Sequence, residues 1–303
     1  MYIENVLKVQ NDWWRYLIGI FVIFIATQIG SIPFIIAIFS KSGLDGASKI
    51  DESSMMTILE NSNLTFFYLL LTFVFGFFGL VLVIKFLHNQ SLLLLTTTRK
   101  KIDFKKILTS FLVACSIIIL TTFVSYIIAP DDYIFNFELK PFLILCLVSI
   151  LLIPFQTSWE EYIFRGYLMQ GVGAISKNKW VPLIITSVSF GLLHYWNPEV
   201  AKIGPLLLVH YVSTGLFFGI ITLMDKGLEL SLGFHAGNNI LIALLVTADW
   251  TVFQTNSVLK SIGEPKIISM IIPLFIIYPL VLFYFSKKYN WSDWKENLTG
   301  KFN

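Results

Sequence analysis

The chain has 303 residues, of which 56% are hydrophobic and 14% are charged, and its formal net charge is +3 at pH 7. Soluble domains carry about 25% charged residues, so this composition excludes an ordinary water-soluble fold. The 28 Phe, 12 Tyr and 8 Trp exclude a disordered chain. The small net charge gives no basic field for nucleic acid. The two cysteines, Cys115 and Cys146, lie far apart and form neither a disulfide framework nor a zinc-binding spacing.

Eight runs free of Asp, Glu, Lys and Arg follow one another along the chain, each close to the length of about 20 residues that a transmembrane helix needs. Strand-type alternation is absent, so we expect an all-α polytopic membrane protein with about eight transmembrane helices and one membrane domain over residues 1–303. Because Glu4 and Asp12 precede the first run, we expect it to be a retained helix, not a signal peptide. The runs are 16–39, 64–84, 107–129, 141–159, 180–197, 203–224, 230–248 and 267–286.

The distribution of basic residues predicts the orientation in the membrane. With eight spans both termini lie on one side, whose loops and tails collect 14 Lys and Arg against 6 on the other side. The positive-inside rule therefore places both termini in the cytoplasm. The abundance of Lys, Ile, Phe and Asn is typical of an AT-rich bacterial genome, so we expect a bacterial cytoplasmic membrane. The polar segment 45–61 is expected to connect the first two spans.

Three charged residues interrupt the apolar character directly after the fourth run, in a helix that we expect to continue to about Val172. Ionisable residues are costly inside a membrane, so each one indicates a function or a specific partner. Glu161 and Arg165 are four residues apart on one helix face and can form an ion pair. Such a pair in a membrane helix usually has a structural role, as a clamp between helices. Glu160 is rotated by about 100° from Glu161. It has no local cation, which suits it to general-base chemistry.

Two further runs each carry a histidine with a companion residue at helical spacing. Phe190 and His194 are four residues apart in the fifth run, so the phenyl ring can pack beside the imidazole. His235 and Asn239 show the same spacing in the seventh run. Because polar groups on three separate helices are each costly in lipid, we expect these residues to converge with Glu160 on one site.

Other residues in these runs have a structural interpretation. The small residues Gly233, Ala236 and Gly237 would let another helix approach the seventh run closely. His210 has no polar companion at helical spacing and is expected to form a hydrogen bond across helices. Asn238 is an additional polar group without an assigned role.

Together the three motifs resemble the signature of the CAAX prenyl endopeptidase and bacteriocin-processing family, known as CPBP or Abi. They occur in the expected order on separate predicted helices, and the resemblance covers a motif-bearing core at about 143–248. The motifs are Glu160-Glu161-x-x-x-Arg165, Phe190-x-x-x-His194 and His235-x-x-x-Asn239.

The resemblance implies an intramembrane endopeptidase with a CAAX prenyl endopeptidase-like helix bundle. It implies that Glu160 and His194 activate a water molecule, and that His235 and Asn239 stabilise the oxyanion. The implied substrate is a membrane-embedded or lipidated peptide or protein, with prenylated CAAX proteins among the candidates. The site-shaping residues that it implies are Glu161, Arg165 and Phe190.

Alternative functions remain open at this stage. Glu160, His194 and His235 also resemble a zinc ligand set with one open position, so a zinc-dependent protease is possible. The sequence lacks the His-Glu-x-x-His motif, and we favour a mechanism without a cofactor. A non-catalytic membrane immunity or scaffold protein could keep the same motifs for packing. A transporter that uses Glu160 in a proton relay is disfavoured, because no internal repeat is visible.

Overall fold

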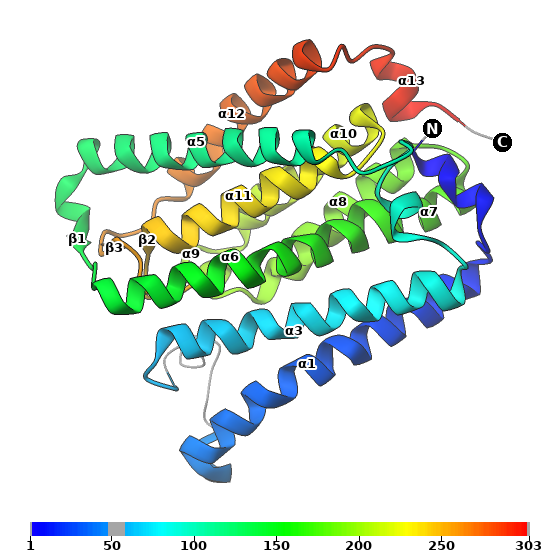
Figure 1. Ribbon diagram of the computed structural model, residues 1–303. Helices are drawn as coiled ribbons and strands as arrows, with labels where there is room; N and C mark the ends of the chain where they lie inside the picture. The colour runs from blue at the N-terminus through cyan, green and yellow to red at the C-terminus, as the bar shows by residue number, and fades with distance from the viewer. Residues whose placement is uncertain (1, 48–57, 302–303) are drawn as a thin grey trace.

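The protein is an all-α polytopic bundle, as expected from its composition (Figure 1). The computed structural model describes residues 2–47 and 58–301. Within these ranges six helices are long and apolar enough to cross a membrane, and a shorter apolar helix covers Trp180–Trp196. The predicted connection at 45–61 lies largely outside the described residues.

Each of the eight predicted runs falls on a helix. The helices are α1 (Trp13–Ala47), α3 (Ser62–Leu82), α5 (Phe104–Ile128), α6 (Leu139–Glu161), α8 (Trp180–Leu193), α10 (Leu208–Asp225), α11 (Glu229–Leu245) and α12 (Ile267–Lys288). Shorter helices connect or extend them, namely α4 (Leu92–Thr96), α7 (Met169–Ser176), α9 (Pro198–Ile203) and α13 (Trp294–Thr299).

Helix α11 lies in the interior of the bundle and contacts α5, α6 and α10. A Cβ atom on Gly233 would stand 2.0 Å from the carbonyl oxygen of Ile107, and one on Gly237 would stand 2.6 Å from that of Phe111. Only glycine permits this distance, so the close approach predicted for the seventh run is confirmed, with α5 as its partner. On the other side, α6 packs against α3, which packs against α1 (Figure 1).

Helix α8 is shorter than predicted. It ends at Leu193 and passes through a 3₁₀ turn at His194–Trp196, whereas the apolar run continues to Asn197. The reason is Pro198, which begins α9 and disfavours helical backbone in the residue before it. Asn197 accordingly has φ −66° and ψ 142°. With 14 residues, α8 spans about 21 Å, less than a hydrocarbon core of about 30 Å.

The charged segment after α6 remains helical for longer than predicted. The helix passes through a π-helical segment, Tyr162–Leu168, and continues as α7 to Ser176, four residues beyond the expected end. Lys177 then adopts a left-handed conformation with φ 52°, which ends the helix. π-Helical segments occur frequently at functional sites. Here the segment begins directly after the two glutamates and contains Arg165.

The two ends of the bundle differ in structure. At one end a small sheet joins β1 (Tyr133–Phe135), β3 (Leu259–Ser261) and β2 (Val246–Thr247) in that order. Strand β3 is antiparallel to β1 and parallel to β2. Both termini lie at the opposite end (Figure 1), where the Lys179 backbone N–H donates to the Gly300 carbonyl. The sheet was not predicted from the sequence, because its strands have at most three residues.

Candidate active site

The centre of the site is a buried carboxylate, Glu161, which is shared by two partners. Arg165 donates from Nη1 to Glu161 Oε1 over 3.0 Å, so the predicted pairing is confirmed. The same oxygen accepts a hydrogen bond from His235 Nδ1 at 2.8 Å. Arg165 also donates from Nη2 to the Gly215 carbonyl of α10 over 3.2 Å. These contacts join the first and third motifs and tie α6 to α11 and α10.

Aromatic rings enclose the Arg165 guanidinium. Its central carbon lies 4.2 Å from the ring centroid of Phe190 and 5.2 Å from that of Phe218. The Phe218 ring also stacks on His235, with ring centroids 4.9 Å apart and an angle of 24° between the planes. Cation–π attraction of this kind strengthens when water is excluded. The rings therefore hold both Arg165 and the imidazole in place, which gives Phe190 the site-shaping position that the resemblance implies.

Glu160 faces a different set of partners. Its Oε1 accepts a hydrogen bond from Gln156, one turn earlier on α6. Its Oε2 lies 3.6 Å from His235 Nε2, which is longer than a direct hydrogen bond. Gln156 Oε1 in turn accepts a hydrogen bond from Asn239 Nδ2 over 3.1 Å. The structure thus brings together Glu160, His235 and Asn239, three of the four polar residues that were expected to converge on one site.

The imidazole of His194 is fixed at the end of α8. Its Nδ1 lies 2.8 Å from the Phe190 carbonyl, and because a carbonyl only accepts, Nδ1 carries the hydrogen and Nε2 is free to accept. The ring packs against Phe190 at 4.8 Å, as predicted, and stacks on Tyr211 of α10 at 4.1 Å. Asn197 donates to the Tyr211 hydroxyl over 3.5 Å.

His194 is not bonded directly to the other predicted catalytic residues. Within the described ranges it forms no hydrogen bond or ion pair with Glu160 or His235. The Phe190 ring contacts both imidazoles, with its centroid 4.8 Å from that of His194 and 6.2 Å from that of His235. The second motif therefore joins the site through an aromatic ring, not through a hydrogen bond.

The donors do not form a ready metal centre. In the part of the chain that the structure describes, no group of three or more His, Cys, Asp or Glu side chains is placed to hold a metal ion. The Nδ1 atoms of His194 and His235 are both hydrogen-bonded, to a carbonyl and to a carboxylate, so only their Nε2 atoms are available to a metal. Among the described residues, Glu160, His194 and His235 are thus not placed together as the possible zinc ligand set.

Sequence reasoning missed two polar residues of the site. Gln156 is a polar residue in an apolar run, one turn before Glu160, so its spacing could have revealed it. Tyr211 gave no such signal, because its contact with His194 depends on how α8 and α10 pack. The neighbouring His210 bonds from Nδ1 to the Met270 carbonyl at 3.3 Å, which confirms the predicted structural role.

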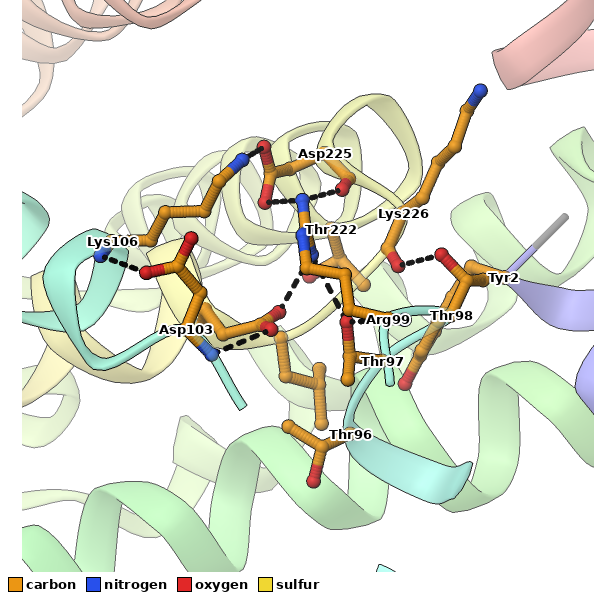
Figure 2. Close-up of polar contacts among 12 residues, drawn as sticks. Tyr2, Thr96, Thr97, Thr98, Arg99, Asp103, Lys106, Thr222, Asp225 and Lys226 are labelled. Carbon is orange, nitrogen blue, oxygen red and sulfur yellow. Dashed lines mark hydrogen bonds and ion pairs between the residues drawn. The ribbon is translucent and has the colours of Figure 1, made fainter. Parts of the chain in front are cut away.

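A second cluster of charged side chains lies at the turn between α10 and α11 (Figure 2). Arg99 donates to Asp225 over 2.8 Å and to Glu229 over 3.1 Å. Lys106 at the start of α5 pairs with the other oxygen of Asp225. The backbone N–H of Asp103 donates to the other oxygen of Glu229 over 3.3 Å. This cluster fastens the segment before α5 to the two helices.

Comparison with known proteins identifies the segment that carries these motifs. The family model described as "Type II CAAX prenyl endopeptidase Rce1-like" matches residues 139–241, which include all three motifs. The chain is also 26% identical over 259 residues to the uncharacterized protein YyaK of Bacillus subtilis (strain 168), covering 80% of this chain and 81% of that protein. No solved structure matches. The motif-bearing segment is thus similar to the Rce1-like type II CAAX prenyl endopeptidases, which confirms the resemblance drawn from the motifs.

Proposed function

We propose that the protein is an intramembrane endopeptidase that hydrolyses peptide bonds of membrane-associated substrates. The observation that carries this proposal is the pair formed by Glu160 Oε2 and His235 Nε2, 3.6 Å apart inside the helix bundle. Both side chains are largely buried, and both can form a hydrogen bond with a water molecule or substrate group placed between them. The match to an endopeptidase family supports the same conclusion.

In this proposal Glu160 is the general base. Water is a weak nucleophile at neutral pH, so amide hydrolysis requires a group that removes its proton. Glu160 Oε2 accepts that proton while the water oxygen forms a bond with the carbonyl carbon. When the carbon–nitrogen bond breaks, the same proton passes to the leaving amine. His194 assists from its free Nε2 by accepting a hydrogen bond from the attacking water, the role that the family resemblance assigns to it.

His235 and Asn239 are the proposed donors to the oxyanion. Glu161 and Phe218 hold the imidazole of His235, and its Nε2 donates when both ring nitrogens carry protons. Asn239 uses one N–H on Gln156 and keeps a second for the substrate. A donor aimed at a developing oxyanion contributes about 3–4 kcal/mol to transition-state stabilisation. The site therefore contains a base and two donors on separate helices.

The proposed substrates are lipidated or membrane-embedded peptides and proteins, including prenylated CAAX-type chains. The helices provide an apolar environment for such substrates, and His235 lies within two turns of the N-terminal end of α11, which follows Lys226. We place that end at the cytoplasmic face of a bacterial cytoplasmic membrane, because the Lys and Arg excess lies there. Cleavage then occurs in the cytoplasmic half of the bilayer.

Cleavage by purified protein in lipid vesicles tests the proposal. The substrates are fluorogenic peptides with and without a prenyl group, together with the membrane peptides of the source cells. Glu160→Gln is expected to abolish cleavage, and Thr157→Val on the same helix is the matched control, because its hydroxyl bonds only within α6. Cleavage that survives Glu160→Gln would overturn the assignment of the base. If the wild type cleaves none of these substrates, the non-catalytic scaffold or immunity function is favoured.

Metal dependence is decided separately. The proposal predicts that protein treated with a chelator and shown by elemental analysis to lack zinc cleaves as fast as untreated protein. Stoichiometric zinc whose removal stops cleavage and whose return restores it would establish the zinc-dependent alternative. Glu160→Gln cannot make this distinction, since both mechanisms require the carboxylate.

A further inference from the structure

Three side-chain amides form a continuous chain that ends on Glu160. Asn238 Nδ2 donates to Asn239 Oδ1 over 3.0 Å, and Asn239 Nδ2 donates to Gln156 Oε1 over 3.1 Å. Gln156 Nε2 then donates to Glu160 Oε1. The chain crosses from α11 to α6. It connects the proposed oxyanion donor with the proposed base through residues that the motifs do not include.

The carboxylate fixes the direction of the whole chain. An ionised carboxylate only accepts hydrogen bonds, so Gln156 must turn its NH₂ group towards Glu160 and its oxygen towards Asn239. Asn239 must then turn its NH₂ group towards Gln156 and its oxygen towards Asn238. The three amides therefore have one mutually consistent arrangement. Reversing any one of them would oppose two donors or two acceptors.

Burial makes the amides of this chain costly to leave unpaired. Gln156 is only 5% exposed and sits in an apolar run of α6. A buried amide without partners is unfavourable, and connected hydrogen bonds in a medium of low dielectric strengthen one another. Gln156 uses both ends of its amide on site residues, Glu160 and Asn239, which lie on different helices. Its position is thus explained by the site and not by packing alone.

We propose that Gln156 and Asn238 are positioning residues that aim the base and the oxyanion donor as one unit. Gln156 anchors one oxygen of Glu160, which leaves the other oxygen facing His235. Asn238 anchors the oxygen of Asn239, which leaves the second N–H of Asn239 for the substrate. This inference rests on the proposed function, and it extends that function to two residues outside the three motifs.

Kinetics of Gln156→Met and Asn238→Ala test the inference in the vesicle assay. Met keeps the length of the side chain and removes its amide. Each variant is expected to lower kcat about 10- to 100-fold with KM unchanged, because misplaced groups weaken only the transition state. The double variant is expected to lose much less than the product of the two single losses, because both residues act through one chain. Thr157→Val serves as the control and is expected to keep the wild-type kcat.

Infrared spectroscopy gives a second measurement that needs no substrate. The band of the Glu160 carboxylate is assigned by its loss in Glu160→Gln. It is expected to shift in Gln156→Met and to stay in place in Thr157→Val. An unshifted band, an unchanged kcat, or losses that multiply independently in the double variant would each overturn the inference. If Glu160→Gln still cleaves, the proposed function fails instead, whatever the behaviour of Gln156→Met.

Discussion

The two buried charge clusters contain similar residues but differ in how completely their polar atoms are bonded. At the turn between α10 and α11, each carboxylate oxygen of Asp225 and Glu229 has a partner. In the central site, Glu161 Oε2 and Arg165 Nε are buried without a hydrogen-bond partner among the described residues. The first cluster is therefore complete as it stands, whereas the second has unused capacity for hydrogen bonds.

This difference separates a structural role from a chemical one. An ion-pair cluster in which every carboxylate oxygen is bonded to a cation or a backbone N–H fixes a loop. A site that reacts must keep donors and acceptors free, although unpaired buried groups are costly. The central site meets this condition at Glu160 Oε2, which stands 3.6 Å from its neighbour His235. Substitutions in the first cluster should therefore affect stability alone, whereas substitutions in the central site should affect cleavage.

The largest expected effect is the loss of cleavage in Glu160→Gln. Without the base, the rate of peptide hydrolysis should fall about 1,000-fold or more, which corresponds to about 4 kcal/mol of activation free energy. The thermal midpoint of unfolding should change little, because the amide can still accept the hydrogen bond from Gln156. The rate is measured in vesicles and the midpoint by intrinsic fluorescence. A large drop in the midpoint would show that this carboxylate is mainly structural.

Glu161→Gln is expected to lower both cleavage and stability. The substitution leaves the fully buried Arg165 without its counter-ion, and breaking such a pair costs about 3–5 kcal/mol of unfolding free energy. It also replaces the carboxylate that holds His235, so cleavage per folded molecule should fall. Chemical denaturation in detergent measures the first effect and the vesicle assay the second. Wild-type stability in this variant would contradict the role of Glu161 as the central acceptor.

The positions of the spans and the identity of the polar site could be predicted from the sequence for one physical reason. Lipid tolerates few polar residues, so the long runs without charge mark the helices and residues such as Glu160 and His235 mark the site. The Glu161–Arg165 pair could be predicted because both residues lie on one helix.

Contacts between helices could not be predicted in the same way. The bond from His235 to Glu161 depends on the relative rotation and depth of α6 and α11, which spacing within one helix does not determine. Tyr211 reaches His194 for a similar reason, through the packing of α10 on α8. The early end of α8 depends on Pro198, whose effect was present in the sequence but was outweighed by the apolar run.

Asp225→Asn should lower stability without lowering cleavage, which is the reverse of the effect expected for Glu160→Gln. Lys106 and Arg99 lose a charged partner, although Arg99 keeps Glu229 and both cations are partly exposed. The unfolding free energy is expected to fall by about 1–2 kcal/mol. Cleavage per folded molecule should match that of the wild type, because the cluster does not contact the site. A lower kcat in correctly folded Asp225→Asn would show that the two clusters are coupled.

The smallest expected effect concerns Glu199, whose hydrogen bonding is intermediate between that of the two clusters. One of its oxygens accepts the Val252 backbone N–H over 2.8 Å, and the other is buried without a partner in the described ranges. Burial raises the pKa of Glu199 above its ordinary value of 4.5. The folded protein therefore binds this proton more tightly than the unfolded chain does. The stability that results is complete below the unfolded pKa and is lost as pH rises through the folded pKa.

Glu199→Gln tests this case, because the amide oxygen can still accept from Val252 and carries no charge at any pH. We expect the variant and the wild type to be similar in stability near pH 4. At pH 8 the variant should be more stable, by less than about 1 kcal/mol, because it has no buried charge to desolvate. Glu264→Gln, at an exposed residue, is the control and should show no such divergence. A stability difference between variant and wild type that stays constant from pH 4 to pH 8 would contradict an unpaired buried charge at Glu199.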